Sequence, residues 1–182
     1  RVEMTQAEEL RAEHLVRSLI QHGVSKYNLG GTAPALPEGR RILVPGQVED
    51  DASIQCGAGA VKTNLDLLRA VRQANPDAVI VYKPHPDVEA GLRKGRVAAE
   101  GLADAVASHA DPMALLADVQ EVWTMTSLLG FEALLRGVPV TTLGTPFYAG
   151  WGLTADLAPA PAWRQARVTL LGLAHAALID YP

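Results

Sequence analysis

The sequence predicts an α/β protein in which a Rossmann-like parallel sheet carries helices on both faces. From residue 41 onward, short apolar segments alternate with segments of helical period, and this order is typical of a parallel sheet wound on both faces. The segment Ala78 to Tyr82 is a continuous apolar run, as expected for a strand buried on both sides. The chain therefore divides into a helix and linker, residues 1–40, and one domain, residues 41–182.

The individual elements follow from periodicity and from end signals. Residues 5–22 repeat aliphatic side chains at i,i+4 and Gly23 supplies a stop, which predicts a helix. Residues 28–39 contain three glycines and two prolines, which predicts a linker. Ser127 and Gly137 mark the two ends of one later helix. The elements expected in the domain are strand 42–44, helix 64–74, strand 78–82, strand 105–107, a short helix from 112, strand 121–125, helix 128–136, strand 138–142 and helix 169–179.

The composition is that of an ordinary soluble globular protein. Hydrophobic residues make up 48% of the 182 residues and charged residues 20%, which is enough to build a core. The net charge of -4 argues against a nucleic-acid partner. The single cysteine, Cys56, excludes an intrachain disulfide and a multi-cysteine zinc site. No apolar run approaches the roughly 20 residues that span a bilayer, so we expect a cytoplasmic protein.

Polar segments follow the ends of four predicted strands. In open parallel sheets, ligands bind outside the carboxyl ends of the strands. We therefore expect one ligand site at this edge of the sheet. The four segments are 47–53, 83–87, 124–127 and 145–151.

The segment KPHP places Lys83 and His85 between prolines directly after a strand. Proline fixes φ, so two phosphate donors are held on a stiff backbone. Solvent-facing side chains in a strand-ending turn are the alternative interpretation. Hydroxyls and N–H groups at a helix N-terminus also form a natural phosphate seat, which makes Thr126 and Ser127 candidates. Glu132 would accept hydrogen bonds from a ribose, although Ser127 as a simple cap and Glu132 as a solvated residue stay open.

Three carboxylates, Glu49, Asp50 and Asp51, follow the first predicted strand. Metal binding, general base catalysis and nucleophilic attack at an anomeric carbon are the possible roles. DxD-type spacing is absent, which disfavours the metal, and we expect none. Gln47 and Ser53 flank the acids, and Trp151 lies in a later aromatic loop. We take these three as candidates to contact a donor substrate, with a packed loop as the alternative for Trp151.

Four phrases in order resemble the capsular polysaccharide β-Kdo transferases, the KpsC-like family. They are VPGQVEDDASI, VYKPHPDVEAG, TMTSLLGFEALLRGVPV and TPFYAGWGLT. The resemblance covers the chain from Arg41 to about Pro182, and Lys26-Tyr27-Asn28 also fits.

The resemblance implies a two-domain, GT-B-like enzyme with an acceptor-binding N-terminal half and a CMP-binding C-terminal half. Residues 1–40 would be an interdomain helix and linker, and residues 41–182 the CMP-sugar-binding domain. The phrase GQVEDDAS is more like the second of the two modules that such proteins often carry. We expect the isolated chain to be inactive without the acceptor half.

The resemblance also implies roles for individual residues. His85 and Ser127 would hold the CMP phosphate with help from Lys83, and Glu132 would bind the ribose. Asp51 would be the nucleophile of a retaining double displacement, with Asp50 as its rival. The donor would be CMP-Kdo and the acceptor a lipid-linked Kdo chain, with no cofactor. Such an acceptor makes association with the inner face of the membrane a further expectation.

Two other functions fit the same sequence. One is a transferase of the same architecture that uses another CMP- or UDP-sugar, and nucleotide preference separates it from a Kdo transferase. The other is a non-catalytic carbohydrate- or partner-binding module. In such a module Asp50 and Asp51 are replaceable without loss of function.

Overall fold

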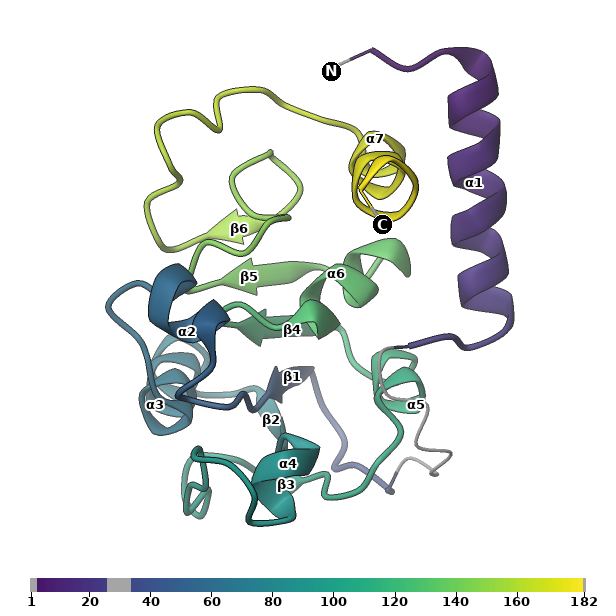
Figure 1. The fold of residues 1–182 in the computed structure, drawn as a ribbon. Helices are drawn as coiled ribbons and strands as arrows, with labels where there is room; N and C mark the ends of the chain where they lie inside the picture. The colour runs from purple at the N-terminus through teal and green to yellow at the C-terminus, as the bar shows by residue number, and fades with distance from the viewer. Residues whose placement is uncertain (1–2, 26–33, 182) are drawn as a thin grey trace.

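The computed structural model describes residues 3–25 and 34–181. The phrase Lys26-Tyr27-Asn28 and residues 28–33 of the predicted linker lie outside the described residues. Figure 1 shows a central sheet with helices to either side of it. The strands are β1 (Arg41–Pro45), β2 (Val79–Lys83), β3 (Ala105–Val106), β4 (Glu121–Thr124), β5 (Val140–Thr142) and β6 (Ala155–Asp156). The helices are α1 (Gln6–Gln21), α2 (Ala52–Gly57), α3 (Asn64–Ala74), α4 (Pro86–Glu89), α5 (Pro112–Leu116), α6 (Leu128–Leu135) and α7 (Leu170–His175), followed by the π-helix η1 (Ala176–Asp180).

The six strands form one sheet in the order β3-β2-β1-β4-β5-β6, and all pairings are parallel. The predicted Rossmann-like α/β fold is confirmed. The chain runs outward from β1 to β3, then returns to the other side of β1 as β4. This reversal between β1 and β4 is the topological switch point, beside which doubly wound proteins bind their ligands.

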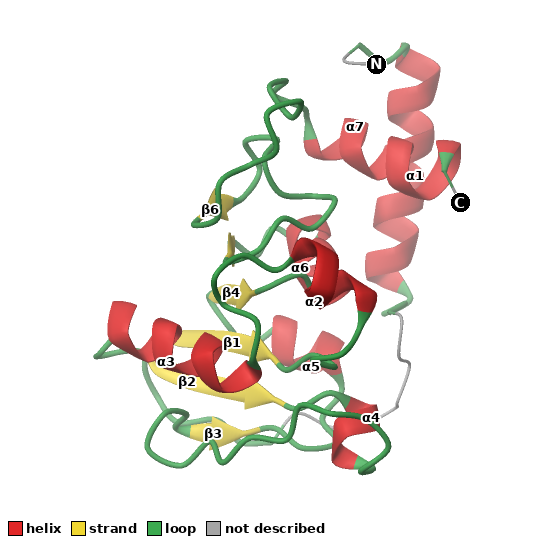
Figure 2. Cartoon of the chain, turned by 60° about the vertical axis from the view of Figure 1, so that its left-hand side comes forward, coloured by secondary structure: helices red, strands yellow, loops and turns green. Residues whose placement is uncertain are grey.

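Alternate residues of the central strands face two separate cores. Ile42, Ile80 and Trp123 pack toward α2 and α3, whereas Leu43 and Val122 pack toward α5, α6 and α7. This alternation follows from the two-residue period of a strand, and it explains why the strands are apolar throughout. Figure 2 shows α3 on one side of the sheet and α5 and α6 on the other. Burial on both faces fixes the positions of the loops that leave the carboxyl ends of the strands.

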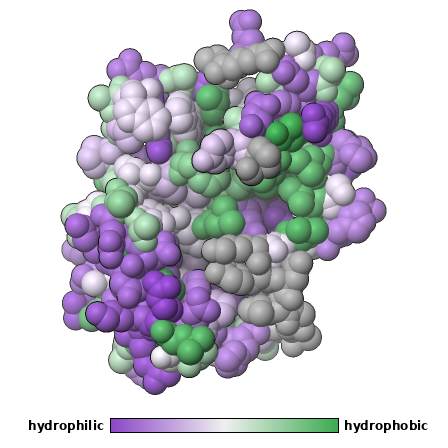
Figure 3. Space-filling model, in the orientation of Figure 1, coloured by the Kyte–Doolittle hydropathy of each residue, from purple (hydrophilic) through white to green (hydrophobic). Residues whose placement is uncertain are grey.

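The first helix is partly covered. Ala12 and Val16 are buried, and α1 lies against α7 in the layer farthest from α3. Leu10 and Ile20 stay exposed at 59% and 42%, and apolar residues gather on the surface between α1 and the neighbouring helices (Figure 3). Part of the aliphatic side of α1 is therefore left uncovered. The division into residues 1–40 and 41–182 stays a prediction.

Three short elements escape sequence prediction, and one helix differs in kind. Helices α2 and α4 have six and four residues and strand β6 has two, too few for a period to be recognised. The predicted helix 169–179 changes to π geometry after His175. His175 Nδ1 contacts Asp180 Oδ2 at 3.1 Å, five residues on, which matches the spacing of a π turn. Among the described residues, no helix combines the length and apolar character needed to cross a bilayer.

Candidate functional site

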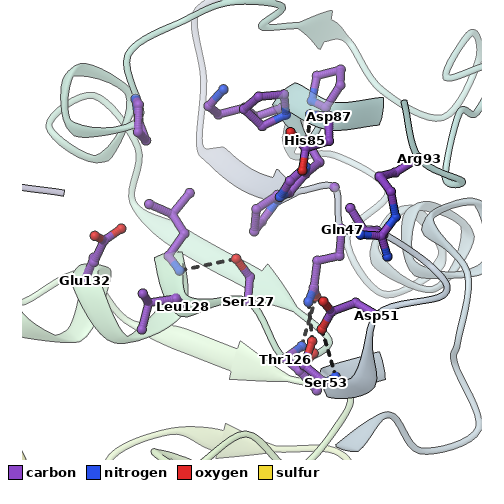
Figure 4. Close-up of a pocket in the computed structure, with 18 of the residues that line it drawn as sticks. Gln47, Asp51, Ser53, His85, Asp87, Arg93, Thr126, Ser127, Leu128 and Glu132 are labelled. Atoms are coloured by element: carbon purple, nitrogen blue, oxygen red, sulfur yellow. Dashed lines mark hydrogen bonds and ion pairs between the residues drawn. The ribbon is translucent and has the colours of Figure 1, made fainter. Parts of the chain in front are cut away.

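A cavity of about 450 Å³ opens at the carboxyl ends of β1, β2 and β4, beside the switch point. Figure 4 shows Glu132 and Asp51 on opposite sides of it, with Ser127 between them and His85 across from Ser127. All four segments that were predicted to meet at this edge contribute residues to its lining. The residues that line it are Pro45, Gly46, Gln47, Val48, Asp51, Ser53, Lys83, Pro84, His85, Pro86, Asp87, Arg93, Pro112, Thr126, Ser127, Leu128, Leu129, Glu132 and Phe147.

Gln47 joins the two loops that diverge at the switch point. Its amide Nε2 donates to Thr126 Oγ1 at 2.9 Å, and its Oε1 accepts from the Thr126 N–H at 2.9 Å and from Thr124 Oγ1 at 3.2 Å. Asn64 holds the Gln47 backbone on the other side. The Gln47 N–H donates to Asn64 Oδ1, and Asn64 Nδ2 donates to the Gln47 carbonyl, both at 2.8 Å. The Gln47 amide is therefore committed to the protein. Gln47 and Thr126 form the floor of the cavity, and these hydrogen bonds hold them there.

The three acids after β1 take different positions. Of these described residues, Asp51 lines the cavity and Glu49 and Asp50 do not. Glu49 Oε1 accepts from the Asn64 N–H at 2.8 Å, and Asp50 Oδ1 pairs with Arg93 Nη2 at 3.0 Å. Glu49 and Asp50 differ from Asp51 because partners from other parts of the chain hold their side chains outside the cavity lining.

Asp51 begins α2 as its N-cap. Its Oδ1 accepts from the Ser53 N–H at 2.8 Å, and both residues are exposed on the cavity wall. The cap fixes the direction of the carboxylate, because one oxygen must meet the first turn of the helix. The cap thereby holds the Asp51 carboxylate beside the cavity.

Lys83 is the most unusual residue of the site. Its side chain is buried, with 6% exposure, and no partner for its Nζ atom exists among the residues that the structure describes. Burial lowers the pKa of Lys83 from its ordinary value, while Glu89 and Asp111 act in the opposite direction. A buried cation without a partner is costly, so an anion in the cavity is its natural complement.

His85 caps α4 through its ring. Nδ1 accepts from the Asp87 N–H at 3.2 Å, and because a backbone N–H can only donate, Nδ1 carries no proton in this arrangement. The neutral ring therefore carries its proton on Nε2. The half-buried ring lines the cavity, and the cap fixes its orientation.

The N-terminus of α6 forms the opposite wall. Ser127 Oγ accepts from the Leu129 N–H at 3.2 Å as the N-cap. The buried Tyr148 hydroxyl donates to the Ser127 carbonyl at 2.5 Å and holds the turn in place. Gly130 makes room for this ring, since a Cβ atom there would lie 2.8 Å from Tyr148 Cζ. Glu132 lines the same wall one turn farther along the helix.

Arg93 is a site residue that sequence reasoning missed. It lines the cavity from the loop after α4 and lies near Asp51 in Figure 4. Gly91 and Gly95 flank it with φ of 73° and 136°, values that favour glycine. Two glycines around a short basic segment were the available signal for a tight loop.

The aromatic candidate lies elsewhere. Trp151 is outside the residues that line the cavity, and its indole N–H donates to the Phe147 carbonyl at 2.7 Å. Its ring packs edge-on against Trp163 and under the Arg164 guanidinium, so the packed-loop interpretation fits the geometry. Within residues 3–25 and 34–181, no group of three or more His, Cys, Asp or Glu side chains is arranged to hold a metal ion.

Two solved structures share this fold and much of this sequence. Over 97% of the chain, it is 39% identical to Thermosulfurimonas dismutans KpsC, beta Kdo 2,7 transferase, with a TM-score of 0.80. Over 96% of the chain, it is 34% identical to the beta Kdo 2,4 transferase of the same organism, with a TM-score of 0.86. The chain covers 54% and 56% of these two structures.

Curated relatives extend the likeness. The chain is 52% identical over 174 residues to the capsule polysaccharide modification protein LipA of Neisseria meningitidis serogroup B. It is 45% identical over 179 residues to the lipopolysaccharide-processing protein LpsZ of Rhizobium meliloti. The chain spans 24% of the length of LipA and 40% of that of LpsZ. The family model of capsule polysaccharide biosynthesis proteins matches residues 5–181. The chain therefore belongs to the capsule polysaccharide biosynthesis protein family, and its resemblance to the KpsC-like members is confirmed.

Proposed function

We propose that this chain is the CMP-Kdo-binding part of a retaining glycosyltransferase that passes β-Kdo to a lipid-linked Kdo acceptor of capsular polysaccharide. The observation that carries the proposal is Lys83, which lines the cavity at the switch point and whose buried Nζ atom has no partner among the described residues. Kdo transferase activity in the two similar structures supports this choice of substrate.

The phosphate of CMP would lie between Lys83, His85 and the N-terminus of α6. Lys83 supplies charge, the His85 ring supplies an Nε2–H donor, and the helix terminus supplies N–H groups and the positive end of its dipole. Glu132 lies farther along α6, where it would bind the ribose that follows the phosphate. The sugar would then point toward Asp51, on the other side of Ser127.

In the proposed reaction, an Asp51 oxygen attacks the anomeric carbon of Kdo. The bond from that carbon to the phosphate oxygen breaks, and its electron pair leaves with CMP. The acceptor hydroxyl then attacks the same carbon, loses its proton and displaces the Asp51 carboxylate. Two inversions retain the β configuration, and a nearby carboxylate stabilises the oxocarbenium character of both steps.

The proposal also covers location and partners. A lipid-linked acceptor requires the complete enzyme to reach a membrane surface, so we propose a cytoplasmic protein that associates with the inner face of the membrane. Acceptor binding would belong to the other half of a GT-B-like module. Turnover is therefore measured in the complete enzyme.

Lys83→Met is expected to weaken CMP binding and, at the same time, to stabilise the fold. Loss of a hydrogen bond from a charged group costs about 1.5–3 kcal/mol, which is roughly tenfold to a hundredfold in affinity. Replacing the unpaired buried ammonium by an apolar side chain of similar length raises the free energy of unfolding, by about 1–3 kcal/mol. Calorimetric titration with CMP and urea unfolding measure the two effects.

The matched control for this variant is Lys62→Met, because Lys62 is exposed and lies outside the cavity. Lys62→Met should change neither the CMP affinity nor the free energy of unfolding. The stability difference depends on pH, since the folded-state pKa of Lys83 is lowered. The wild type gains stability between that lowered pKa and the ordinary value of 10.5, where the unfolded state binds more protons, so the advantage of Lys83→Met shrinks there. Unchanged CMP affinity in Lys83→Met, or a preference of the wild type for UDP, would contradict the proposal.

His85→Asn is expected to reduce CMP affinity by about fivefold to tenfold with little change in stability. Asparagine is a good N-cap, so it keeps an acceptor for the Asp87 N–H while removing the Nε2 donor. His85→Ala removes both and should lose about 1 kcal/mol of unfolding free energy in addition. CMP titration and urea unfolding of the pair separate binding from capping. If His85→Asn binds CMP as tightly as the wild type does, the His85 ring is not part of the phosphate site.

A further inference from the structure

We propose that Arg93 binds the carboxylate of the donor's sugar acid and thereby makes the site specific for an acidic sugar. This inference rests on the proposed function, because it concerns the sugar end of the same cavity. Arg93 would be a specificity residue for the donor, and Asp50 would position it.

The location of Arg93 identifies which part of a donor it meets. The nucleotide end of the cavity is defined by Ser127 and Glu132 on α6. Arg93 lies on the side of Asp51 in Figure 4, and it pairs with Asp50, the residue before Asp51. A group bound at Arg93 therefore lies close to the atom that Asp51 would attack.

Backbone hydrogen bonds on both sides hold Arg93 in this position. Its own N–H donates to the Asp87 carbonyl at 3.2 Å, which ties the loop to α4. The next carbonyl, that of Lys94, accepts from the Glu49 N–H at 3.1 Å, which ties the loop to the segment after β1. Arg93 is thus fixed between the loops of two neighbouring strands, although its side chain is exposed.

Gly95 makes this close approach possible. Its carbonyl accepts from Asn64 Nδ2 at 2.9 Å, and its φ of 136° favours glycine. A Cβ atom at this position would lie 2.7 Å from the Gln47 carbonyl oxygen, so any other residue would push the loop outward. The packing that places Arg93 therefore depends on the same Gln47–Asn64 contacts that build the cavity floor.

The basic side chains of the cavity match the two negative charges of a nucleotide-activated sugar acid. Such a donor carries one negative charge on its phosphodiester and one on its carboxylate. Among the described residues that line the cavity, Lys83 and Arg93 are the lysine and arginine side chains. With Lys83 at the phosphate, Arg93 is left for the carboxylate, and its planar guanidinium suits two-point binding of that group.

Asp50 can release Arg93 at little cost. The Asp50–Arg93 ion pair spans 3.0 Å, and both side chains are 43% exposed. Ion pairs in water contribute little because solvent screens them and replaces their hydrogen bonds. Asp50 therefore orients the Arg93 guanidinium while the site is empty. When a donor fills the site and excludes water, the guanidinium can leave Asp50 and pair with the carboxylate of the donor.

Arg93 also removes an electrostatic obstacle to the proposed reaction. In a 2-keto sugar acid the carboxylate is attached to the anomeric carbon itself. Asp51 must then approach a carbon whose substituent carries the same charge as the attacking group, and the two charges repel. Arg93 bound to that substituent neutralises it and allows Asp51 to approach.

The test measures carboxylate recognition separately from nucleotide binding. The complete enzyme is saturated with CMP and titrated with 2-deoxy-Kdo and with its C1 carboxamide, which differ in charge but hardly in shape. We expect the wild type to bind the acid about tenfold to a hundredfold more tightly than the amide. Arg93→Gln should bind the two equally, Arg93→Lys should fall between, and CMP affinity should change by less than about threefold in each variant.

Arg96→Gln is the matched control, since this exposed arginine three residues away lies outside the cavity. It should keep the preference of the wild type. Equal binding of acid and amide by the wild type, or an undiminished preference in Arg93→Gln, overturns the inference while CMP binding still stands. Failure of the wild type to bind CMP overturns the proposed function instead.

Discussion

Asp51→Asn in the complete enzyme is expected to reduce Kdo transfer by at least about a thousandfold and to leave CMP affinity within about threefold. Loss of a nucleophile removes the chemical step, and such losses reach about a millionfold in hydrolases that use one. Asparagine keeps the hydrogen bond with the Ser53 N–H that caps α2, so the substitution removes the charge and preserves the loop. Initial rates with CMP-Kdo and calorimetric titration with CMP provide the two readouts.

Asp50→Asn is the matched control in the same loop. Asp50 lies outside the cavity lining and pairs with Arg93, so its loss should lower the transfer rate by no more than about tenfold. Mass analysis of the wild-type enzyme given CMP-Kdo should show a Kdo adduct on the peptide that contains Asp51. An adduct on Asp50 or Glu49, or near-normal transfer by Asp51→Asn, would show that the nucleophile is a different residue.

Gly130→Ala should destabilise the 182-residue chain by about 2–3 kcal/mol, although alanine is the better helix former. The added methyl group would overlap the Tyr148 hydroxyl and lie 2.8 Å from its Cζ atom. Tyr148 is fully buried and cannot move without repacking the core around Phe131, and overpacked cores lose stability of this size. Urea unfolding measures the loss, and CMP titration should show weaker binding because Tyr148 holds the Ser127 carbonyl.

Gly172→Ala in α7 supplies the comparison. A Cβ atom there would meet the Thr169 hydroxyl, which caps α7, at 3.1 Å, a contact that a shift of a few tenths of an ångström relieves. Its effect should stay within about 1 kcal/mol of zero. The double variant Gly130→Ala/Tyr148→Phe should be more stable than the sum of its single changes, because the overlapping oxygen is gone. Additive losses would mean that the ring does not limit the space at residue 130.

The fold was predictable because its signals are local. The helix expected at 64–74 matches α3 at both ends, since its leucines repeat at helical spacing and Pro76 follows it. The strand expected at 78–82 is displaced by one residue from β2, an error that a uniformly apolar run invites. The order of strands and helices was enough to indicate a parallel sheet.

The site was predictable only as an edge of that sheet. Lys83, His85, Ser127 and Glu132 line one cavity, as a strand-end rule suggests. The directions of the three acids depend on partners far along the chain: Glu49 meets Asn64 and Asp50 meets Arg93, 43 residues away. Such pairings arise from tertiary packing, so neither the outward turn of Asp50 nor the role of Arg93 follows from spacing alone.

The seam between β1 and β4 gives the molecule an internal line of division. Two residue pairs join β1 to β4, whereas five join β1 to β2. Side chains bridge the rest of this junction: Arg40 and Arg41 pair with Glu121 and Asp118 at one end, and the Gln47 amide contacts Thr126 at the other. The junction thus separates two units of the sheet, β1–β3 and β4–β6, and the Gln47 amide bridges them at the carboxyl ends of the strands. A ligand that contacts Lys83 on one unit and Ser127 on the other would add a second link between the two units. Occupancy of the cavity would therefore make the opening of the two units more cooperative as well as rarer.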